Sequence, residues 1–203
     1  MSRCTFSVGA TSQLRRSVSR LRSRSYRRWV VVAVGKPLLP EMEMMKPVIP
    51  EKGHKQLRKG RFSQRGSFYF VTVCCRDGRK VFTAPTTVQP VFDCLDWLSK
   101  NRWIELHCCM VMPDHVHFVF RLVGKRTLSQ VMKSSKQFTA RRLNQQAGTR
   151  GPVWQRQFYD HLVRSDESLR EIVRYCWFNP VRAGLAKDPK DYPYWRSRYV
   201  IEV

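Results

Sequence analysis

Two histidines lie one residue apart in residues 112–120, whose sequence is MPDHVHFVF. Side chains of a β-strand alternate between its faces, so His115 and His117 would point one way and Val116 and Phe118 the other. Two imidazoles at this spacing can share a divalent metal ion, which takes a third ligand and keeps positions open for a substrate. The same pattern also fits two histidines that only occupy a half-exposed strand.

A second candidate group is Tyr175, in a helix that we expect to begin near Ser165 and Asp166. The core-facing stripe of this helix follows from helical spacing and comprises Leu169, Ile172, Val173, Cys176 and Trp177. At ~100° per residue, Tyr175 lies about 130° from the middle of that stripe and Asn179 about 90°. We therefore expect both side chains on a flank outside the core, although a surface tyrosine before a helix-ending Asn-Pro pair would give the same pattern.

The elements that must position these groups follow from periodicity and turn residues. Strands are predicted over residues 67–75, 103–112 and 153–163, and from His115 to the break at Gly124. Helices are predicted over residues 88–100 and 128–144, and Pro113-Asp114 predicts a hairpin turn. This order predicts an α+β, ferredoxin-like (split β-α-β) fold. Its antiparallel sheet would carry two helices on one face, leave the other free for a ligand and hold the histidines on a central strand.

Composition limits the partners. The 203 residues contain 38 Lys and Arg against 15 Asp and Glu, a formal net charge of +23. Nucleic acid is the favoured acidic partner, and no membrane association is expected because no apolar run approaches the ~20 residues that cross a bilayer. The seven cysteines include two adjacent pairs in expected strands, where neighbours face opposite sides and cannot chelate together. We expect reduced thiols in a cytoplasmic protein.

The basic charge is concentrated in part at the start of the chain. Residues 1–40 contain nine basic residues and no acid. This segment has too little apolar surface to fold alone. We expect residues 1–57 to be a disordered leader and linker, and residues 58–203 to be the functional domain with a basic tail. Alternatively, translation starts at Met42, Met44 or Met45, and the leader is not part of the translated protein.

Three ordered motifs resemble a known family. The His115-Val116-His117 motif after Met-Pro-Asp resembles that of the HUH endonucleases. Residues 154–161 (WQRQFYDH) and 174–184 (RYCWFNPVRAG) resemble the bacterial single-tyrosine transposases, and most of all the REP-associated tyrosine transposases. The resemblance covers roughly residues 60–200. It implies a bacterial enzyme, monomer or homodimer, that uses Mg²⁺ or Mn²⁺ to cleave and rejoin single-stranded DNA near hairpins through a 5′-phosphotyrosine.

The resemblance also implies roles for individual residues. Tyr175 corresponds to the nucleophile, and His115 and His117 to the metal ligands. Asn179 occupies the place of a third ligand that is often Gln in the family. Three further residues would support the site by packing and orientation, namely Trp154, Phe158 and His161. A phenol has a pKa near 10, so such a nucleophile needs its proton removed or its anion stabilised.

Basic residues near the expected elements are candidates for phosphate contacts. They are Arg58, Lys59, Arg61 and Arg65 before the first strand, Lys133, Lys136, Arg141 and Arg142 on the second helix, and Arg196 and Arg198 near the C-terminus. Two alternatives remain open. The chain could be an RNA-binding ferredoxin-like module, although it lacks the RNP1 pattern, or a catalytically silent DNA-binding relative. In both, replacing Tyr175 by Phe would change no activity.

Overall fold

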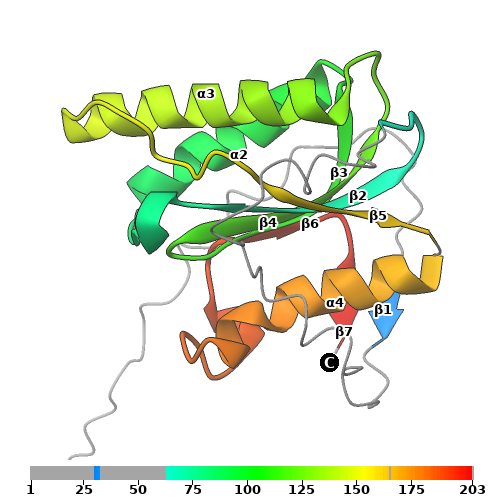
Figure 1. Ribbon diagram of the computed structural model, residues 1–203. Helices are drawn as coiled ribbons and strands as arrows, with labels where there is room; N and C mark the ends of the chain where they lie inside the picture. The colour runs from blue at the N-terminus through cyan, green and yellow to red at the C-terminus, as the bar shows by residue number, and fades with distance from the viewer. Residues whose placement is uncertain (1–29, 33–62, 165, 203) are drawn as a thin grey trace, which may run out of the picture.

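A computed structural model describes residues 30–32, 63–164 and 166–202 (Figure 1). The predicted alternation of strands and helices is confirmed. The elements are β1 (Val30–Val32), β2 (Phe68–Cys74), α2 (Pro85–Lys100), β3 (Ile104–Val111), β4 (His115–Leu122), α3 (Leu128–Ala147), β5 (Tyr159–Val163), α4 (Asp166–Arg182), β6 (Trp195–Ser197) and β7 (Val200–Glu202), with short 3-10 turns at Arg76–Gly78 and Pro189–Asp191.

Five strands form an antiparallel sheet in the order β5-β2-β4-β3-β6, so the histidine-bearing β4 is the central strand, as predicted. The first four strands have the split β-α-β arrangement, and β6 extends it along the edge of β3. The predicted hairpin is also confirmed, since Met112 N donates to His115 O at 2.8 Å across the Pro113-Asp114 turn. Separately, β1 pairs in parallel with β7, and the rest of the predicted leader and linker, residues 1–29 and 33–57, lies outside the described residues.

Helices cover both faces of the sheet. In Figure 1, α2 and α3 lie on one face and α4 on the other. The prediction that one face is free is therefore wrong, because the apolar stripe of α4 needs burial as much as those of α2 and α3 do.

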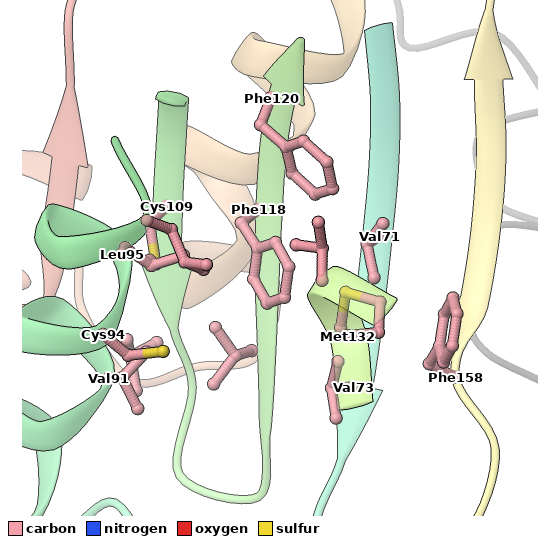
Figure 2. Packing of buried hydrophobic residues seen from close by; sticks show 14 of the residues in the cluster. Val71, Val73, Val91, Cys94, Leu95, Cys109, Phe118, Phe120, Met132 and Phe158 are labelled. Atoms are coloured by element: carbon pink, nitrogen blue, oxygen red, sulfur yellow. The ribbon is translucent and has the colours of Figure 1, made fainter. Parts of the chain in front are cut away.

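Two cores result, one on each face. Under α2 and α3, Figure 2 shows the side chains that β2 and β4 direct to this face packing against the helices, among them Val71, Val73, Phe118 and Phe120 with Val91, Leu95 and Met132. The opposite face of the same strands contributes Phe70 and Val119 to the core under α4. Cys109 belongs to the first core and Cys108 to the second, and the six cysteines of the described part are all free, as predicted. No helix in the described ranges is long and apolar enough to cross a membrane.

Element boundaries depart from prediction near three residues. Helix α2 begins at Pro85 because proline suits a first helical position, where its missing N–H costs nothing. The strand expected over residues 153–163 is regular only from Tyr159, and Trp154 makes a single bridge to Cys75. Helix α4 continues through Pro180 to Arg182.

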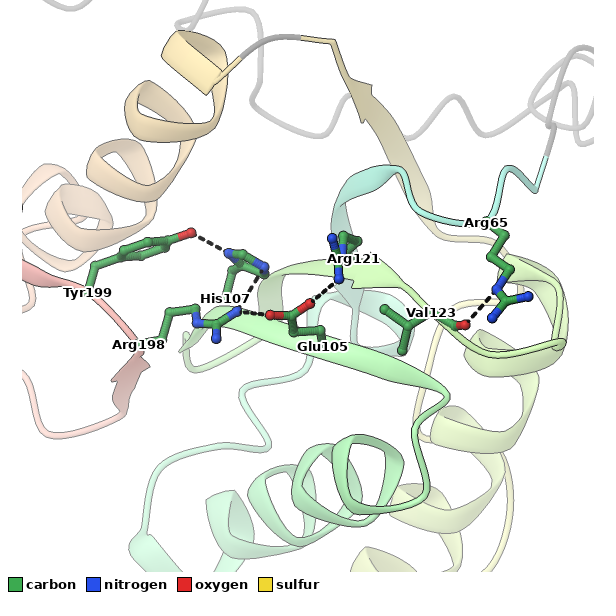
Figure 3. Close-up of polar contacts among 7 residues, drawn as sticks. All are labelled: Arg65, Glu105, His107, Arg121, Val123, Arg198 and Tyr199. Atoms are coloured by element: carbon green, nitrogen blue, oxygen red, sulfur yellow. Dashed lines mark hydrogen bonds and ion pairs between the residues drawn. The ribbon is translucent and has the colours of Figure 1, made fainter. Parts of the chain in front are cut away.

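The segment after α4 returns to the sheet and is held there by polar contacts (Figure 3). Arg198 forms an ion pair with Glu105, and its Nη1 donates to His107 Nε2 at 3.2 Å. His107 then carries its proton on Nδ1 and donates to the Tyr199 hydroxyl. Burial, followed by the charge of Arg198, lowers the pKa of His107 from 6.5 to about 4.

This cluster predicts an acid-sensitive fold. Below pH ~6.5 the unfolded chain protonates His107 while the folded protein does not, so the free energy of unfolding should fall as the pH drops from ~6.5 towards ~4. The slope due to His107 is at most ~1.4 kcal/mol per pH unit. Urea denaturation across this range should show a flatter profile for His107→Gln, which stays neutral. Profiles that remain parallel would contradict the assignment.

Candidate active site beneath helix α4

The candidate site lies on the sheet face that α4 covers. Residues paired across neighbouring strands share a face, and His117 pairs with Thr72 while His115 pairs with Cys74. On the next strand Tyr159 pairs with Thr72, and His161 with Phe70. The register therefore places both predicted ligands on the face to which α4 brings Tyr175.

The two imidazoles converge. His115 Nε2 lies 3.0 Å from His117 Nε2, and the ring centroids are 4.6 Å apart. His115 Nδ1 donates to Asp114 Oδ1 at 2.6 Å, which directs the Nε2 lone pair of His115 towards His117. On the other side, His117 Nδ1 lies 2.8 Å from Thr72 Oγ1, a hydroxyl able to donate or accept.

Burial controls the protonation of His117. His117 is 1% exposed, and burial, then the charges of His115 and Arg182, hold its pKa well below the usual range. A neutral imidazole is the form that ligates a metal. Asp114 is more exposed, and its hydrogen bond with His115 lowers the pKa of the carboxyl group. The pair is thus one neutral imidazole next to another that is oriented by a carboxylate.

The donor set fits a shared divalent ion. Two neighbouring ligands of an octahedral ion at ~2.1 Å are about 3.0 Å apart, which matches the Nε2–Nε2 distance. Within the described ranges, no group of three His, Cys, Asp or Glu residues could complete the coordination. The third ligand would therefore be an amide such as that of Asn179, water or substrate oxygen. Metal binding stays a prediction.

Tyr175 lies against this pair. Its ring centroid is 5.9 Å from that of His117 and 6.1 Å from that of Phe70, both edge to face. The prediction of an exposed flank is wrong, since Tyr175 is 6% exposed and Asn179 is 9% exposed. The reason is that Tyr175 itself faces the sheet, against Phe70 and His117, whereas Trp177 packs on Trp195 of the returning segment, with the ring centroids 5.3 Å apart.

Arg182 is a site residue that the sequence did not reveal. It follows Tyr175 by two helical turns, its Cζ lies 3.9 Å from the Tyr175 ring centroid, and its Nη2 donates to Tyr175 O at 2.9 Å. Burial raises the pKa of Tyr175, and the charge of Arg182 opposes that rise. Its place in the 174–184 motif and its seven-residue spacing from Tyr175 were possible signals, but neither gave Arg182 a role.

The predicted supporting residues divide between the two faces. His161 lies on the site face, on the edge strand β5. Trp154 and Phe158 belong to the core under α2 and α3 instead, and Trp154 Nε1 donates to Thr139 Oγ1 at 2.8 Å. Both therefore stabilise the opposite side of the sheet, since the chain before β5 crosses beneath α3 before joining the edge.

The predicted phosphate-binding residues are scattered. Arg58, Lys59 and Arg61 lie outside the described residues. The α3 side chains Lys133, Arg141 and Arg142 are exposed in the layer opposite the site, and Lys136 donates to Gln155 O and Arg156 O.

Three other predicted phosphate-binding residues form ion pairs or hydrogen bonds within the protein. Arg196 pairs with Asp96 at 2.7 Å and lies over the Phe92 ring, Arg198 pairs with Glu105, and Arg65 Nε donates to Val123 O at 2.9 Å. The structure brings none of the described predicted cations to the histidine pair.

The fold therefore brings two converging imidazoles and Tyr175 together beneath α4, and comparison with known proteins places the chain. Residues 64–176, which include both histidines and Tyr175, match the family described as "Transposase IS200 like", and the chain belongs to that family. Its relatives include REP-associated tyrosine transposases.

Three relatives illustrate the similarity. The REP-associated tyrosine transposase of Escherichia coli (strain K12) is 28% identical over 136 residues, covering 66% of this chain and 78% of that protein. A Haemophilus influenzae protein named for the same group is 25% identical over 143 residues, covering 64% of this chain and 79% of that protein. A solved structure of a REP-associated tyrosine transposase bound to a REP hairpin has 25% identity and a TM-score of 0.57, covering 66% and 79%.

Burial of Tyr175 has a measurable consequence. Tyr175→Ala should lower the free energy of unfolding by ~3–5 kcal/mol, because it leaves a cavity between Phe70 and His117. Tyr175→Phe keeps both ring contacts and should cost at most ~1.5 kcal/mol. Urea denaturation of both variants provides the measurement. A cost below ~1 kcal/mol for the alanine variant would restore the exposed-flank hypothesis.

Proposed function

We propose that this transposase cleaves single-stranded DNA next to a hairpin and rejoins the ends through a covalent bond to Tyr175. A divalent ion, Mg²⁺ or Mn²⁺, held by His115 and His117 would assist. The observation that carries the proposal is the edge-to-face contact between the Tyr175 and His117 rings, 5.9 Å apart, beside the 3.0 Å Nε2 pair. A phosphate placed there is within reach of both the nucleophile and the imidazoles.

Tyr175 has the role of nucleophile. Its phenolic oxygen attacks phosphorus as the bond from phosphorus to the 3′-oxygen breaks, which leaves a 5′-phosphotyrosine and a free 3′-OH. The phenolic proton is lost, and the leaving 3′-oxygen gains one, so the exchange is balanced. The new phosphodiester retains the energy of the old one, and a second 3′-OH can reverse the step and release Tyr175 without ATP.

Arg182 supports this attack. Burial alone makes the anion of Tyr175 costly, and the guanidinium over its ring provides the opposing charge. Among the described residues, Arg182 donates through Nη2 to Tyr175 O, and its other N–H groups can donate to a non-bridging phosphate oxygen. Arg182 would thus orient the phosphate and stabilise its developing charge.

The histidine pair would hold the ion, with Asp114 and Thr72 keeping the rings in place. Such an ion, when bound, polarises the scissile phosphate as a Lewis acid. Asn179, one turn after Tyr175 and buried, is the nearest amide along α4 that could add a third ligand. The substrate class is supported by the net charge of +23 and by the relative solved with a REP hairpin.

The covalent step can be tested directly. Incubating labelled hairpin DNA carrying single-stranded flanks with Mn²⁺ should give an adduct that survives denaturing electrophoresis. Tyr175→Phe should abolish it. Tyr159→Phe is the matched control, because Tyr159 is on the same sheet face and close enough for its charge to affect the pKa of Tyr175. An adduct lost only in the Tyr159 variant would move the nucleophile to β5, and none in the wild type would indicate a silent relative.

Replacing a histidine of the pair should affect DNA cleavage but not DNA affinity. His115→Ala should abolish Mn²⁺-dependent cleavage while changing DNA affinity by no more than ~3-fold, since phosphate contacts by Lys and Arg dominate binding. Cleavage kinetics and fluorescence anisotropy measure the two quantities. If a folded His115 variant loses DNA binding together with cleavage, the histidine is structural.

A further inference from the structure

A groove of about 1510 Å³ lies at the other end of β4 from the histidines. Its walls are the end of α2, the first residues of β3, the end of β4 with the loop that follows, and the segments around Arg65 and Arg198. We call it the β3-edge groove. Six basic side chains line it, against two acids, Asp96 and Glu105; the basic residues are Arg65, Lys100, Arg102, Arg121, Lys125 and Arg198.

The two acids do not offset this charge. Asp96 pairs with Arg196, which lies outside the lining, at 2.7 Å. Glu105 is shared by two guanidiniums, Arg121 at 2.9 Å and Arg198 (Figure 3). No acidic side chain in the described part of the chain forms an ion pair with Lys100, Arg102 or Lys125. The groove therefore presents excess positive charge.

Part of this charge is held in place. Glu105 bridges Arg121 of β4 and Arg198 of the returning segment, which limits the freedom of both guanidiniums. Arg102 has a φ of 58°, in the left-handed region that a residue with a side chain rarely adopts. Gly124 packs so closely on it that an added Cβ would be 2.7 Å from Arg102 O. Strained backbone of this kind is concentrated at binding sites.

The groove is aligned with the candidate active site. Arg121 is four residues after His117 on β4, so both side chains project from the same face. At ~3.3 Å per residue the two positions are about 13 Å apart, roughly four steps of a duplex with ~3.4 Å rise. Val119, between them on that face, is buried under α4, so a DNA molecule that reaches both positions must pass around α4 rather than along β4.

We propose that the β3-edge groove binds the phosphate backbone of the DNA segment adjoining the one cleaved at Tyr175, as a second contact on the same substrate molecule. This inference rests on the proposed function for the identity of the substrate. The open edge of β3 at Ile104–Leu106 suggests a second occupant, a strand from another copy of the chain. Flanking lysines and arginines disfavour such edge pairing, whereas they suit phosphates.

The test compares two triple variants with the same change of charge. Lys100→Gln, Arg102→Gln and Lys125→Gln together remove three cations of the groove that have no ion pair in the described part of the chain. Lys133→Gln, Arg141→Gln and Arg142→Gln together remove three exposed cations from α3, on the opposite face. Both are made in the full chain carrying Tyr175→Phe, so that binding is measured without cleavage. The probe is a DNA hairpin with a single-stranded flank, and the dissociation constant is measured over a series of salt concentrations.

The groove variant should lose affinity on the order of 100-fold at physiological salt, and its slope of log K against log salt should fall by about 3. The α3 variant should stay within ~3-fold of its parent. With Tyr175 restored, saturating DNA should bring the groove variant to its parent's rate of adduct formation. Urea midpoints establish that both variants fold.

Equal losses in the two variants, or a larger loss in the α3 variant, would overturn the proposal. A groove variant that changes oligomeric state in sedimentation while keeping its DNA affinity would assign the groove to a second copy and overturn it as well. Because the binding measurement uses a chain without the nucleophile, failure of the proposed chemistry would appear as a missing adduct in the Tyr175 protein and leave the groove result intact.

Discussion

The packing of α4 on the histidine face of the sheet is the constraint on which the site depends. Neither layer forms the site alone, since β4 carries the imidazoles and α4 carries the tyrosine and Arg182. The same contact buries the apolar stripe of α4, including Ile172 and Val173, against Phe70 and Val119. Stability and positioning are therefore one interaction, because the burial that holds the helix also sets the distance between Tyr175 and His117.

That burial has opposite electrostatic effects on the two partners. It keeps His117 neutral, which suits a ligand, and it raises the pKa of Tyr175, which opposes nucleophilic attack. Arg182 offsets the second effect and reinforces the first, since its charge lowers the pKa of both groups. A guanidinium is well suited to this place because it stays charged even where burial lowers its own pKa.

Local patterns in the sequence correctly predicted the features that depend on local backbone geometry, such as strand faces and turns. Alternation along residues 115–120 gave the two faces of β4, Pro113-Asp114 gave the hairpin, and both agree with the structure. The prediction for Tyr175 was wrong because a helical wheel averages all apolar positions into one stripe. In the structure Trp177 packs on Trp195, 18 residues later, and Tyr175 packs on the sheet. Trp154 and Phe158 were predicted to pack around the site but lie in the core under α2 and α3, because the chain before β5 has no periodicity that would reveal its path.

The sequence also could not predict which basic side chains are available to bind a partner. The excess of +23 indicates an acidic partner, but it does not say which cations are available to that partner. Arg196 and Arg198 stand in a basic C-terminal tail and nevertheless hold the returning segment to Asp96 and Glu105. Lys100 and Arg102, in a stretch with ordinary charge balance, are exposed beside a groove. The free energy of binding a polyanion depends on which cations keep unneutralised charge in the folded chain, and only the long-range ion pairs determine that.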